Sequence, residues 1–236
     1  MPPFFLTRHD WLRIYAVAIP NCLLASDRIN YALCLLNMTA IQITRLDTED
    51  IAPAVEIFFA AFDDDPLMSY FFEDRYQSIA RQTMQYICDR ANVLDLPLLG
   101  AVMEGELQGV ALMTPPEAIE QETAQLDEQF AIAVGEGVIS RLETYSQVKK
   151  ARQPQQPHFY LDILGVLPES QGQGIGKTLL TAIHQMSEAS SLSRGVALDT
   201  GKASNVDLYQ HFGYSVTAID DLEQTKLWSM FRANSV

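Results

Sequence analysis

A strand, a proline, a glycine-rich loop and a helix follow one another between His158 and Met186, in the passage HFYLDILGVLPESQGQGIGKTLLTAIHQM. The apolar run typical of a buried strand ends at Val166, and Pro168 cannot donate to a continuing strand ladder. Apolar side chains then recur at helical spacing, at Ile175, Leu179, Leu180, Ile183 and Met186. The sequence therefore predicts a loop that leads directly into the N-terminus of a helix.

The loop QGQGIGKT, Gln171 to Thr178, has the chemistry of an anion site. The first N–H groups of a helix have no intrahelical acceptor and lie at the positive end of the helix dipole. Glycines at every second position let this backbone approach an anion without interference from Cβ atoms. We therefore expect the loop to bind a phosphate group.

Spacing excludes two common nucleotide motifs. A P-loop requires a glycine five residues before Gly176, where Gln171 stands. A dinucleotide fingerprint that starts at Gly172 requires its third glycine where Lys177 stands. The pattern that fits is Q-x-x-G-x-G, with Gln171, Gly174 and Gly176 in the named positions.

The remaining chain alternates strand-like and helical patterns, which predicts an α/β domain. We expect strands at 40–46, 158–166, 195–200, 214–219 and 224–231, and a hairpin over 98–115 that turns at Glu104-Gly105-Glu106. We expect helices at 48–62 with Thr48 as the cap, from Pro66 onward, and at 73–92, 117–150, 174–190 and 204–211.

Residues 1–37 differ in charge from the rest of the chain. They hold three Arg and two Asp, which gives +1 without histidine, so the remainder carries −15 because the total is −14. Two interpretations stay open: Met38 is the true initiator and 1–37 an upstream read, or 1–37 is an extra helical arm. In both cases residues 38–236 form the predicted domain, and a chain of 236 residues should bury roughly 70% of its unfolded surface.

Membrane insertion is not expected. No uninterrupted apolar run approaches the roughly 20 residues that span a bilayer. A signal peptide is a poor fit, because the apolar run before Pro20 is short and no A-x-A cleavage site follows it.

The distribution of charge and the cysteine content limit the binding partners and the cell compartment that we expect. Acidic residues without any Lys or Arg occupy the stretch from 117 to 136: Glu117, Glu120, Glu122, Asp127, Glu128 and Glu136. This opposes nucleic-acid binding and favours attraction of cationic substrates, although a solvated helix face has the same pattern. Three cysteines, Cys22, Cys34 and Cys88, have neither metal-ligand spacing nor a paired framework, which predicts a cytoplasmic protein and no metal site.

Two stretches resemble a known family. The run V-x-P-x-x-Q-x-x-G-x-G, Val166 to Gly176, is similar to the acetyl-CoA signature of the GNAT N-acetyltransferase superfamily. The stretch NVDLYQHFGY, Asn205 to Tyr214, resembles the second signature of that family. AFDDDP, YFFED and the strand HFYL resemble the branch that includes puromycin acetyltransferase. The resemblance covers about 41–231.

The resemblance implies a fold and a cofactor site. The fold would be α/β, with a mixed, mostly antiparallel central sheet whose strands splay apart and are flanked by helices. Backbone groups of the loop would bind the pyrophosphate of coenzyme A, and the end of the strand would pair with the pantetheine amides. The implied cofactor-binding residues are Leu164, Gly165, Val166, Gln171, Gly172, Gln173, Gly174, Ile175, Gly176, Lys177 and Asn205.

Tyr209 is the candidate general acid. It follows Asn205 by four residues and therefore shares its helix face, and the family places this tyrosine near the sulfur of the thioester. A phenol has a reference pKa of about 10 and is therefore protonated at neutral pH, so it has a proton to donate to a departing thiolate. The alternative is an ordinary core aromatic.

The general base is less defined. His158, Tyr160 and Asp162 share one strand face by period two, and relatives with a carboxylate on this strand would carry it where Tyr160 stands. We therefore expect Asp162 to act directly or through water, with His158 as a further candidate. Both could instead be structural, and His184 and His211 are expected to be packing or surface groups.

The sequence thus predicts a cytoplasmic acetyl-CoA-dependent N-acetyltransferase of a small-molecule amine, acting as a monomer or homodimer. Two alternatives stay open. The chain could acylate a protein N-terminus or lysine, or use another acyl-CoA. It could also be a non-catalytic acyl-CoA-binding domain, because fold does not fix function.

Overall fold

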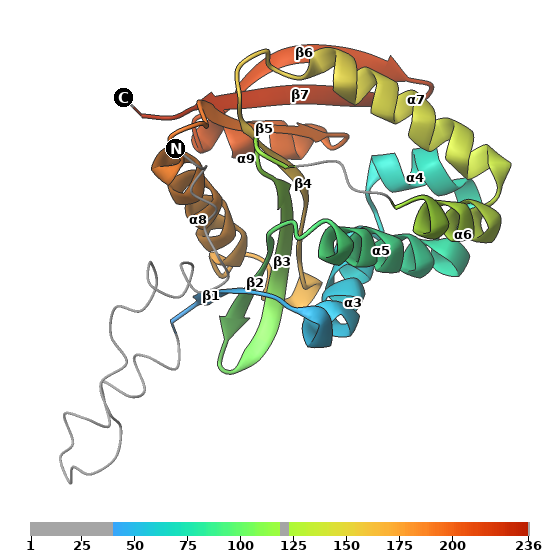
Figure 1. The fold of residues 1–236 in the computed structure, drawn as a ribbon, viewed down its shortest axis with the longest axis horizontal. Coiled ribbons are helices and arrows are strands. Elements are labelled where there is room, and N and C mark those ends of the chain that lie inside the picture. Colours follow the sequence, from blue (N-terminus) through green and yellow to red (C-terminus); the bar gives the residue numbers. More distant parts are fainter. Residues whose placement is uncertain (1–39, 119–122, 236) are drawn as a thin grey trace, which may run out of the picture. The chain divides into compact units, whose positions relative to one another are not determined.

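The structure is a computed structural model, and it describes residues 40–118 and 123–235 (Figure 1). The predicted extension 1–37, Met38, and the acids Glu120 and Glu122 lie outside these residues. The described chain forms a seven-stranded sheet in the order β1-β2-β3-β4-β5-β7-β6. The strands are β1 (Gln42–Arg45), β2 (Leu98–Met103), β3 (Glu106–Thr114), β4 (Phe159–Val166), β5 (Gly195–Thr200), β6 (Ser215–Leu222) and β7 (Thr225–Ala233).

Helices cover both faces of this sheet. They are α3 (Ile51–Ala61), α4 (Pro66–Phe72), α5 (Tyr76–Val93), α6 (Ala124–Val134), α7 (Glu136–Arg152), α8 (Ile175–Ala189) and α9 (Ala203–His211). Single 3₁₀ turns occupy Thr48–Asp50, Glu73–Arg75 and Pro168–Ser170. In Figure 1, α8 and the pair α3 and α5 lie on opposite sides of β2, β3 and β4, and α4, α6 and α7 group beyond α5.

Three apolar clusters hold these layers together. The first joins α8 and part of α9 to one face of the sheet, with Ile175, Leu179 and Ile183 fully buried. The second joins α3 and α5 to the other face around Phe58 and Met84. The third joins α4, α6 and α7 to the turn between β6 and β7. The apolar stripe predicted on α8 is thus the stripe that packs on the sheet.

The sheet opens between its only parallel pair. β4 and β5 pair over Phe159–Leu161 and Val196–Leu198, and beyond these residues no pairing joins the two described strands. The remainder of β4 keeps β3 on one edge, and a register shift leaves Asp162 unpaired as a bulge. All other strand pairs are antiparallel. The predicted mixed, mostly antiparallel sheet with splayed strands is confirmed.

Two local predictions need correction. Asp47, not Thr48, begins the turn that leads into α3, because its side chain accepts from the Glu49 N–H and forms a capping box with Asp50. The helix expected over 117–150 is two helices, α6 and α7. Gly135 has φ +86°, outside the helical region, so it ends α6 and begins α7.

Candidate active site

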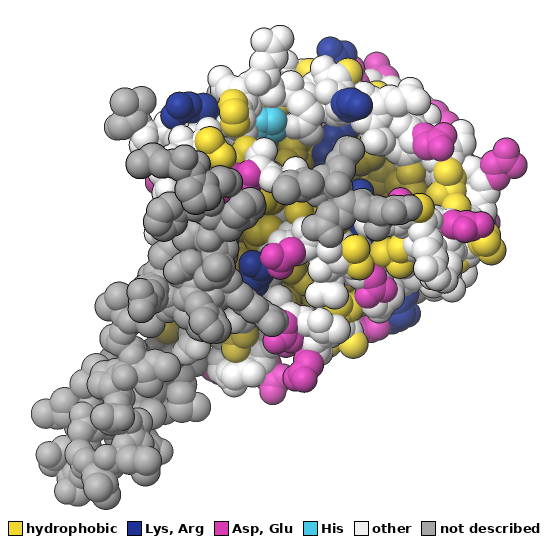
Figure 2. Space-filling view, viewed as in Figure 1, with side chains coloured by type: hydrophobic (Ala, Val, Ile, Leu, Met, Phe, Trp, Pro, Cys, Tyr) yellow, Lys and Arg dark blue, Asp and Glu magenta, His cyan; other side chains and the backbone are white. Residues whose placement is uncertain are grey.

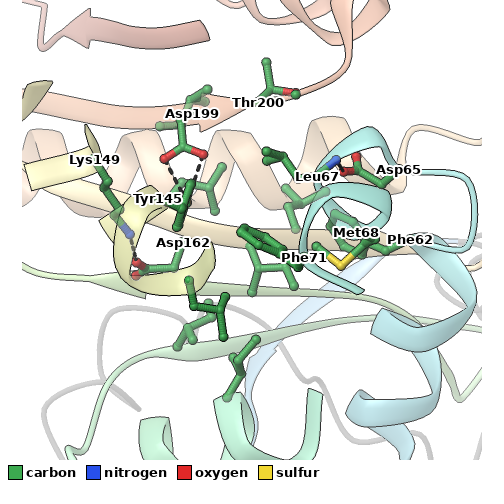
Figure 3. Close-up of a pocket in the computed structure, with 18 of the residues that line it drawn as sticks. Phe62, Asp65, Leu67, Met68, Phe71, Tyr145, Lys149, Asp162, Asp199 and Thr200 are labelled. Carbon is green, nitrogen blue, oxygen red and sulfur yellow. Dashed lines mark hydrogen bonds and ion pairs between the residues drawn. The ribbon is translucent and has the colours of Figure 1, made fainter. Parts of the chain in front are cut away.

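A cavity of about 460 Å³ lies where β4 and β5 separate. Its lining comes from α4, α5, α6, α7, α9, β3, β4 and β5, so it joins segments from most of the described domain. Figure 3 shows an apolar wall on the α4 side, made by Phe62, Leu67, Met68 and Phe71, opposite a polar group from α7, β4 and β5. The separation of the two strands therefore exposes both backbone and side chains to one cavity.

The glycine loop presents backbone donors beside this opening. Gly172 and Gly174 have φ of +77° and +87°, a conformation that glycine adopts without strain, and Gly174 caps α8. Within the described chain, the N–H groups from Gly172 to Lys177 have no protein acceptor. The Gln171 side chain donates to the Val166 carbonyl at 3.3 Å and fastens the loop to the end of β4. The arrangement is that of an anion site.

Gly165 and Gly176 occupy their positions for different structural reasons. A Cβ at Gly165 would lie 3.1 Å from both Ala61 Cβ and Phe58 Cδ1, a tight fit, so close packing of α3 favours glycine there. A Cβ at Gly176 would meet only ordinary contacts, at 3.7 and 3.9 Å, and its φ is not positive. The protein itself therefore leaves room at Gly176, beside the open N–H groups.

The other predicted cofactor residues contribute in different ways. Leu164 lines the cavity, whereas the Ile175 side chain is 1% exposed in the core and can offer only its backbone. Gln173 and Lys177 are exposed, and Val166 packs against the core under α8. The described residues fit the phosphate and pantetheine of coenzyme A, because open donors and an unpaired strand edge lie next to one another.

Asn205 and Tyr209 both reach the cavity from α9, as their spacing predicts. Asn205 Nδ2 donates to Thr200 Oγ1 at 3.4 Å, and the Tyr209 ring packs edge-on against Tyr214 at 5.6 Å. No described residue hydrogen-bonds the Tyr209 hydroxyl. Burial, together with the nearby Asp199 and Asp65 carboxylates, raises the pKa of Tyr209 to about 12. Tyr209 is therefore protonated at neutral pH, with its proton uncommitted.

Asp162 lies in the cavity wall but is already engaged. One carboxylate oxygen forms an ion pair with Lys149 Nζ at 2.7 Å, and the other accepts from Thr114 Oγ1 at 2.6 Å. Lys149 also stands 3.9 Å from the centre of the Tyr160 ring. Figure 3 shows Lys149 reaching down from α7 to this carboxylate. The bulge in β4 turns Asp162 toward α7.

The structure places the histidines elsewhere. His158 is not among the residues that line the cavity, and its ring nitrogens lie 2.8 Å from Gln156 O and 2.6 Å from Gln153 Oε1. His184 Nε2 lies 2.9 Å from the Tyr214 hydroxyl, and burial lowers the pKa of His184 to about 4. The prediction of a packing role for His184 is confirmed.

Sequence reasoning missed a partly buried polar group centred on Asp199. The Tyr145 hydroxyl donates to both oxygens of Asp199 at 3.0 Å, and the Tyr160 hydroxyl donates to the same carboxylate (Figure 3 shows Tyr145 and Asp199). Burial raises the pKa of Asp199, while Lys149 opposes that rise. Burial also raises the pKa of both tyrosines well above their usual range. The available signal was one acid at the end of the apolar strand VALD.

Two further acids border the cavity. Asp65 caps α4 by accepting from the Leu67 N–H at 2.8 Å, and burial raises its pKa. Asp127 accepts from the Tyr86 hydroxyl at 2.7 Å and lies 4.0 Å from Arg90. On the face drawn in Figure 2, Asp and Glu side chains spread along the lower and right-hand side, the side of α3, α5 and α6. The surroundings therefore favour a cation over an anion.

The described residues hold neither a metal-binding cluster nor a membrane-spanning helix. In residues 40–118 and 123–235, no group of three or more His, Cys, Asp or Glu side chains is arranged to hold a metal ion. None of the described helices combines the length and the apolar character needed to cross a bilayer.

Comparison with known proteins agrees with this geometry. Residues 127–216 match the family model of the acetyltransferase (GNAT) domain, a stretch that includes the glycine loop and α9. The histone acetyltransferase HPA2 and related acetyltransferase from Corynebacterium glutamicum has 18% identity and a TM-score of 0.60, over 84% of this chain and 98% of that one.

Two other solved structures are similar. The polyamine N-acetyltransferase of Drosophila melanogaster, which catalyses the formation of N-acetylagmatine, has 16% identity and a TM-score of 0.58, over 81% of this chain and 98% of that one. The yncA structure from Salmonella typhimurium, with its cofactor acetyl-CoA, has 15% identity and a TM-score of 0.51, over 84% and 95%. The described domain therefore has the fold of the GNAT acetyltransferases.

Proposed function

We propose that this protein is an acetyl-CoA-dependent N-acetyltransferase whose acceptor is a small-molecule amine. One observation carries the proposal: the edge that β4 exposes beyond Leu161 lies beside a loop whose N–H groups, from Gly172 to Lys177, have no acceptor among the described residues. The amide groups of a bound cofactor would pair with the β4 edge, and its pyrophosphate would accept from the N–H groups of the loop. The match of residues 127–216 to the acetyltransferase domain supports the same assignment.

In this proposal the backbone binds the cofactor. The pantetheine amides pair with Leu164–Val166, and the pyrophosphate takes the N–H groups of the loop at the positive end of α8. Gln171 keeps the loop against β4, Lys177 adds a positive charge nearby, and Asn205 orients the Thr200 end of β5. When bound, acetyl-CoA supplies an activated acetyl group as a thioester.

Tyr209 is proposed as the general acid. Tyr209 lines the cavity, no described residue hydrogen-bonds its hydroxyl, and its raised pKa keeps it protonated over the working pH range. A thiolate that leaves during acetyl transfer is a stronger base in this enclosed space than in water, because burial disfavours its charge. Tyr209 therefore has a proton to give to the sulfur as the C–S bond breaks.

The acceptor is proposed to be a cation with an apolar body. Phe62, Leu67, Met68 and Phe71 form an apolar wall, whereas the opposite side carries carboxylates. The Drosophila enzyme of similar fold is a polyamine N-acetyltransferase, so polyamines and agmatine belong in any screen of acceptors.

The test combines binding and turnover. Acetyl-CoA is titrated into the full chain by calorimetry, and thiol release is then measured with a panel of polyamines, arylalkylamines, amino acids and N-terminal peptides. The proposal predicts saturable binding and thiol release with a small amine. Binding without thiol release from any acceptor indicates a non-catalytic domain, release only with peptides indicates a protein acetyltransferase, and no binding at all contradicts the proposal.

A further inference from the structure

We propose that Asp199 binds the ammonium group of the acceptor and accepts its proton, and that Tyr145 and Tyr160 hold the Asp199 carboxylate in position for this step. The inference rests on the proposed function. It names a catalytic base on β5, whereas the sequence pointed to Asp162 on β4.

The position of Asp199 follows from the strand pairing. Leu198 and Leu161 form the last pair between β5 and β4, so Asp199 is the first residue of β5 beyond the pairing. It therefore lies at the apex of the opening, and Asp199 and Tyr209 line the same cavity. The acid proposed for the sulfur and the base proposed for the nitrogen thus border one space.

The Asp199 carboxylate has no ion-pair partner among the described residues. Asp162 contacts Lys149 at 2.7 Å, so that pair is neutral as a unit. No described Lys or Arg makes an ion pair with Asp199, whose hydrogen-bond donors are the two tyrosines. A buried carboxylate is costly unless a cation compensates it. An acceptor ammonium would be the missing partner.

The groups that face Asp199 come from several elements. Tyr145 and Lys149 extend from α7, and Tyr160 and Asp162 from β4. Tyr209 on α9 is affected by Asp199 and, more weakly, by Asp65 at the start of α4. Lys149 and the tyrosine hydroxyls stabilise the Asp199 anion, whereas burial and Asp162 favour its protonated form. Asp199 is therefore a stronger base than an exposed aspartate.

Asp162 is a weaker candidate for the same role. Both of its oxygens are occupied, by Lys149 and by Thr114, so proton transfer to Asp162 would disrupt an existing ion pair. The donors of Asp199 are neutral hydroxyls, which can remain in contact with a protonated carboxyl group. The two carboxylates thus have separate roles: Asp162 holds Lys149 in an ion pair, and Asp199 binds the substrate ammonium and accepts its proton.

The proton balance is complete with these groups. An acceptor that enters as R–NH₃⁺ transfers one proton to Asp199, and the freed lone pair forms the N–C bond with the acetyl carbonyl carbon. The C–S bond breaks, Tyr209 donates its proton to the sulfur, and the Tyr209 oxygen then takes the second proton from the nitrogen. The products are the amide and the thiol. One proton remains on Asp199 and is released to solvent.

The experiment measures kcat/KM against pH for the best amine of the panel, in the wild type, Asp199→Asn and Asp162→Asn. In the wild type, kcat/KM should rise with pH along an acid limb of unit slope as the base loses its proton. The Asp199→Asn variant should lose this acid limb, and its kcat/KM should fall by roughly 10²–10⁴. Its KM for the amine should rise. Asp162→Asn, the matched control on the same cavity wall, should keep the limb.

Two conservative variants give an independent readout. Tyr160→Phe or Tyr145→Phe removes a donor that stabilises the Asp199 anion, so the pKa of Asp199 should rise and the acid limb should move to higher pH. A purely structural role would lower activity without moving the limb. This shift decides the question even if Asp199→Asn does not fold.

The outcomes separate the two proposals. A wild type that releases no thiol with any amine overturns the proposed function, and this inference with it. An active wild type whose acid limb survives Asp199→Asn, or disappears in Asp162→Asn, overturns only the role of Asp199. Calorimetry with acetyl-CoA checks each variant, and affinity near that of the wild type shows that the cofactor site is intact.

Discussion

The two halves of the proposed site, the cofactor end and the acceptor end, differ in which part of the chain supplies their binding groups. The cofactor end uses the main chain of adjacent residues, with exposed N–H groups from Gly172 to Lys177 and the free edge of β4. The acceptor end uses side chains brought from α4, α7, β4, β5 and α9, and its central groups, Tyr145, Tyr160 and Asp199, are hydrogen-bonded to one another.

This difference predicts how each end responds to change. A main-chain site tolerates altered side chains but not altered backbone geometry or added bulk at its glycines. A site of side chains depends on single functional groups, whose removal leaves the surrounding fold intact. Substitutions that remove one functional group but keep the size of the side chain should therefore impair mainly the acceptor end. Substitutions of the loop glycines should impair mainly the cofactor end.

Tyr209→Phe should have the largest effect. It keeps the ring that packs against Tyr214 and removes only the proton to be donated. We expect kcat to fall by roughly 10²–10⁴, with acetyl-CoA affinity little changed, because the lost interaction occurs only in the transition state. Steady-state kinetics and calorimetry measure the two quantities.

Tyr214→Phe is the matched control for Tyr209→Phe. It removes a hydroxyl from the neighbouring ring, which bonds His184 rather than facing the cavity. It should cost about 1–3 kcal/mol of stability, since a buried partner is left unsatisfied, while kcat stays near the wild-type value. Near-normal kcat in Tyr209→Phe would mean that water protonates the thiolate.

The free energy of unfolding should depend on pH through His184, which is buried against Tyr214 next to Tyr209. His184 is 8% exposed, and burial together with Arg232 lowers its folded pKa from 6.5 to about 4. The stability from keeping it neutral is present above pH 6.5 and is lost as pH falls toward 4, since the unfolded chain binds a proton there first.

Between about pH 7.5 and about pH 5, this group should cost about 2 kcal/mol of unfolding free energy. Urea denaturation at both pH values measures the loss. His184→Gln should remove that part of the pH dependence, since Gln does not titrate. An identical pH dependence in the two proteins would show that His184 is not held neutral.

Gly176→Ala should weaken the cofactor end alone. The protein leaves ordinary contact distances for the new Cβ, and alanine favours a helix over glycine by about 0.5–1 kcal/mol, so stability should rise slightly. Acetyl-CoA affinity should fall by roughly tenfold, or about 1.4 kcal/mol, if the ligand approaches this backbone. Calorimetry and thermal unfolding give both values, and unchanged affinity argues against that approach.

Removal of residues 1–37 should have the smallest effect. The chain from Met38 contains every described strand and helix, so it should fold and bind acetyl-CoA as the full chain does. Thermal unfolding and titration compare the two chains. A melting temperature lower by many degrees would assign the first 37 residues to the folded core.

Sequence predicted the parts of the site that lie close together along the chain. The loop, α8 and the pair Asn205 and Tyr209 each depend on local spacing, and the structure places Asn205 and Tyr209 in one cavity. Local signals also failed where a neighbour competed: Asp47 replaced Thr48 as the cap, and Gly135 divided a helix.

The acceptor end could not be predicted in the same way. Tyr145 and Tyr160 precede Asp199 by 54 and 39 residues, and no pattern in a single sequence signals that they meet. They meet because the fold brings α7 to the cavity between β4 and β5, two strands that are adjacent in the sheet but separated in the chain. The pairing of Lys149 with Asp162 has the same origin.

The central claim is that the open N–H groups of the glycine loop bind the cofactor, and backbone amide NMR tests it directly. Acetyl-CoA is titrated into ¹⁵N-labelled protein while glycine resonances are followed. The account predicts that Gly172, Gly174 and Gly176 shift and saturate together, whereas Gly105 and Gly135, which share the positive φ of Gly172 and Gly174 but lie outside the loop, do not move. Saturable binding with the three loop resonances unmoved would contradict it.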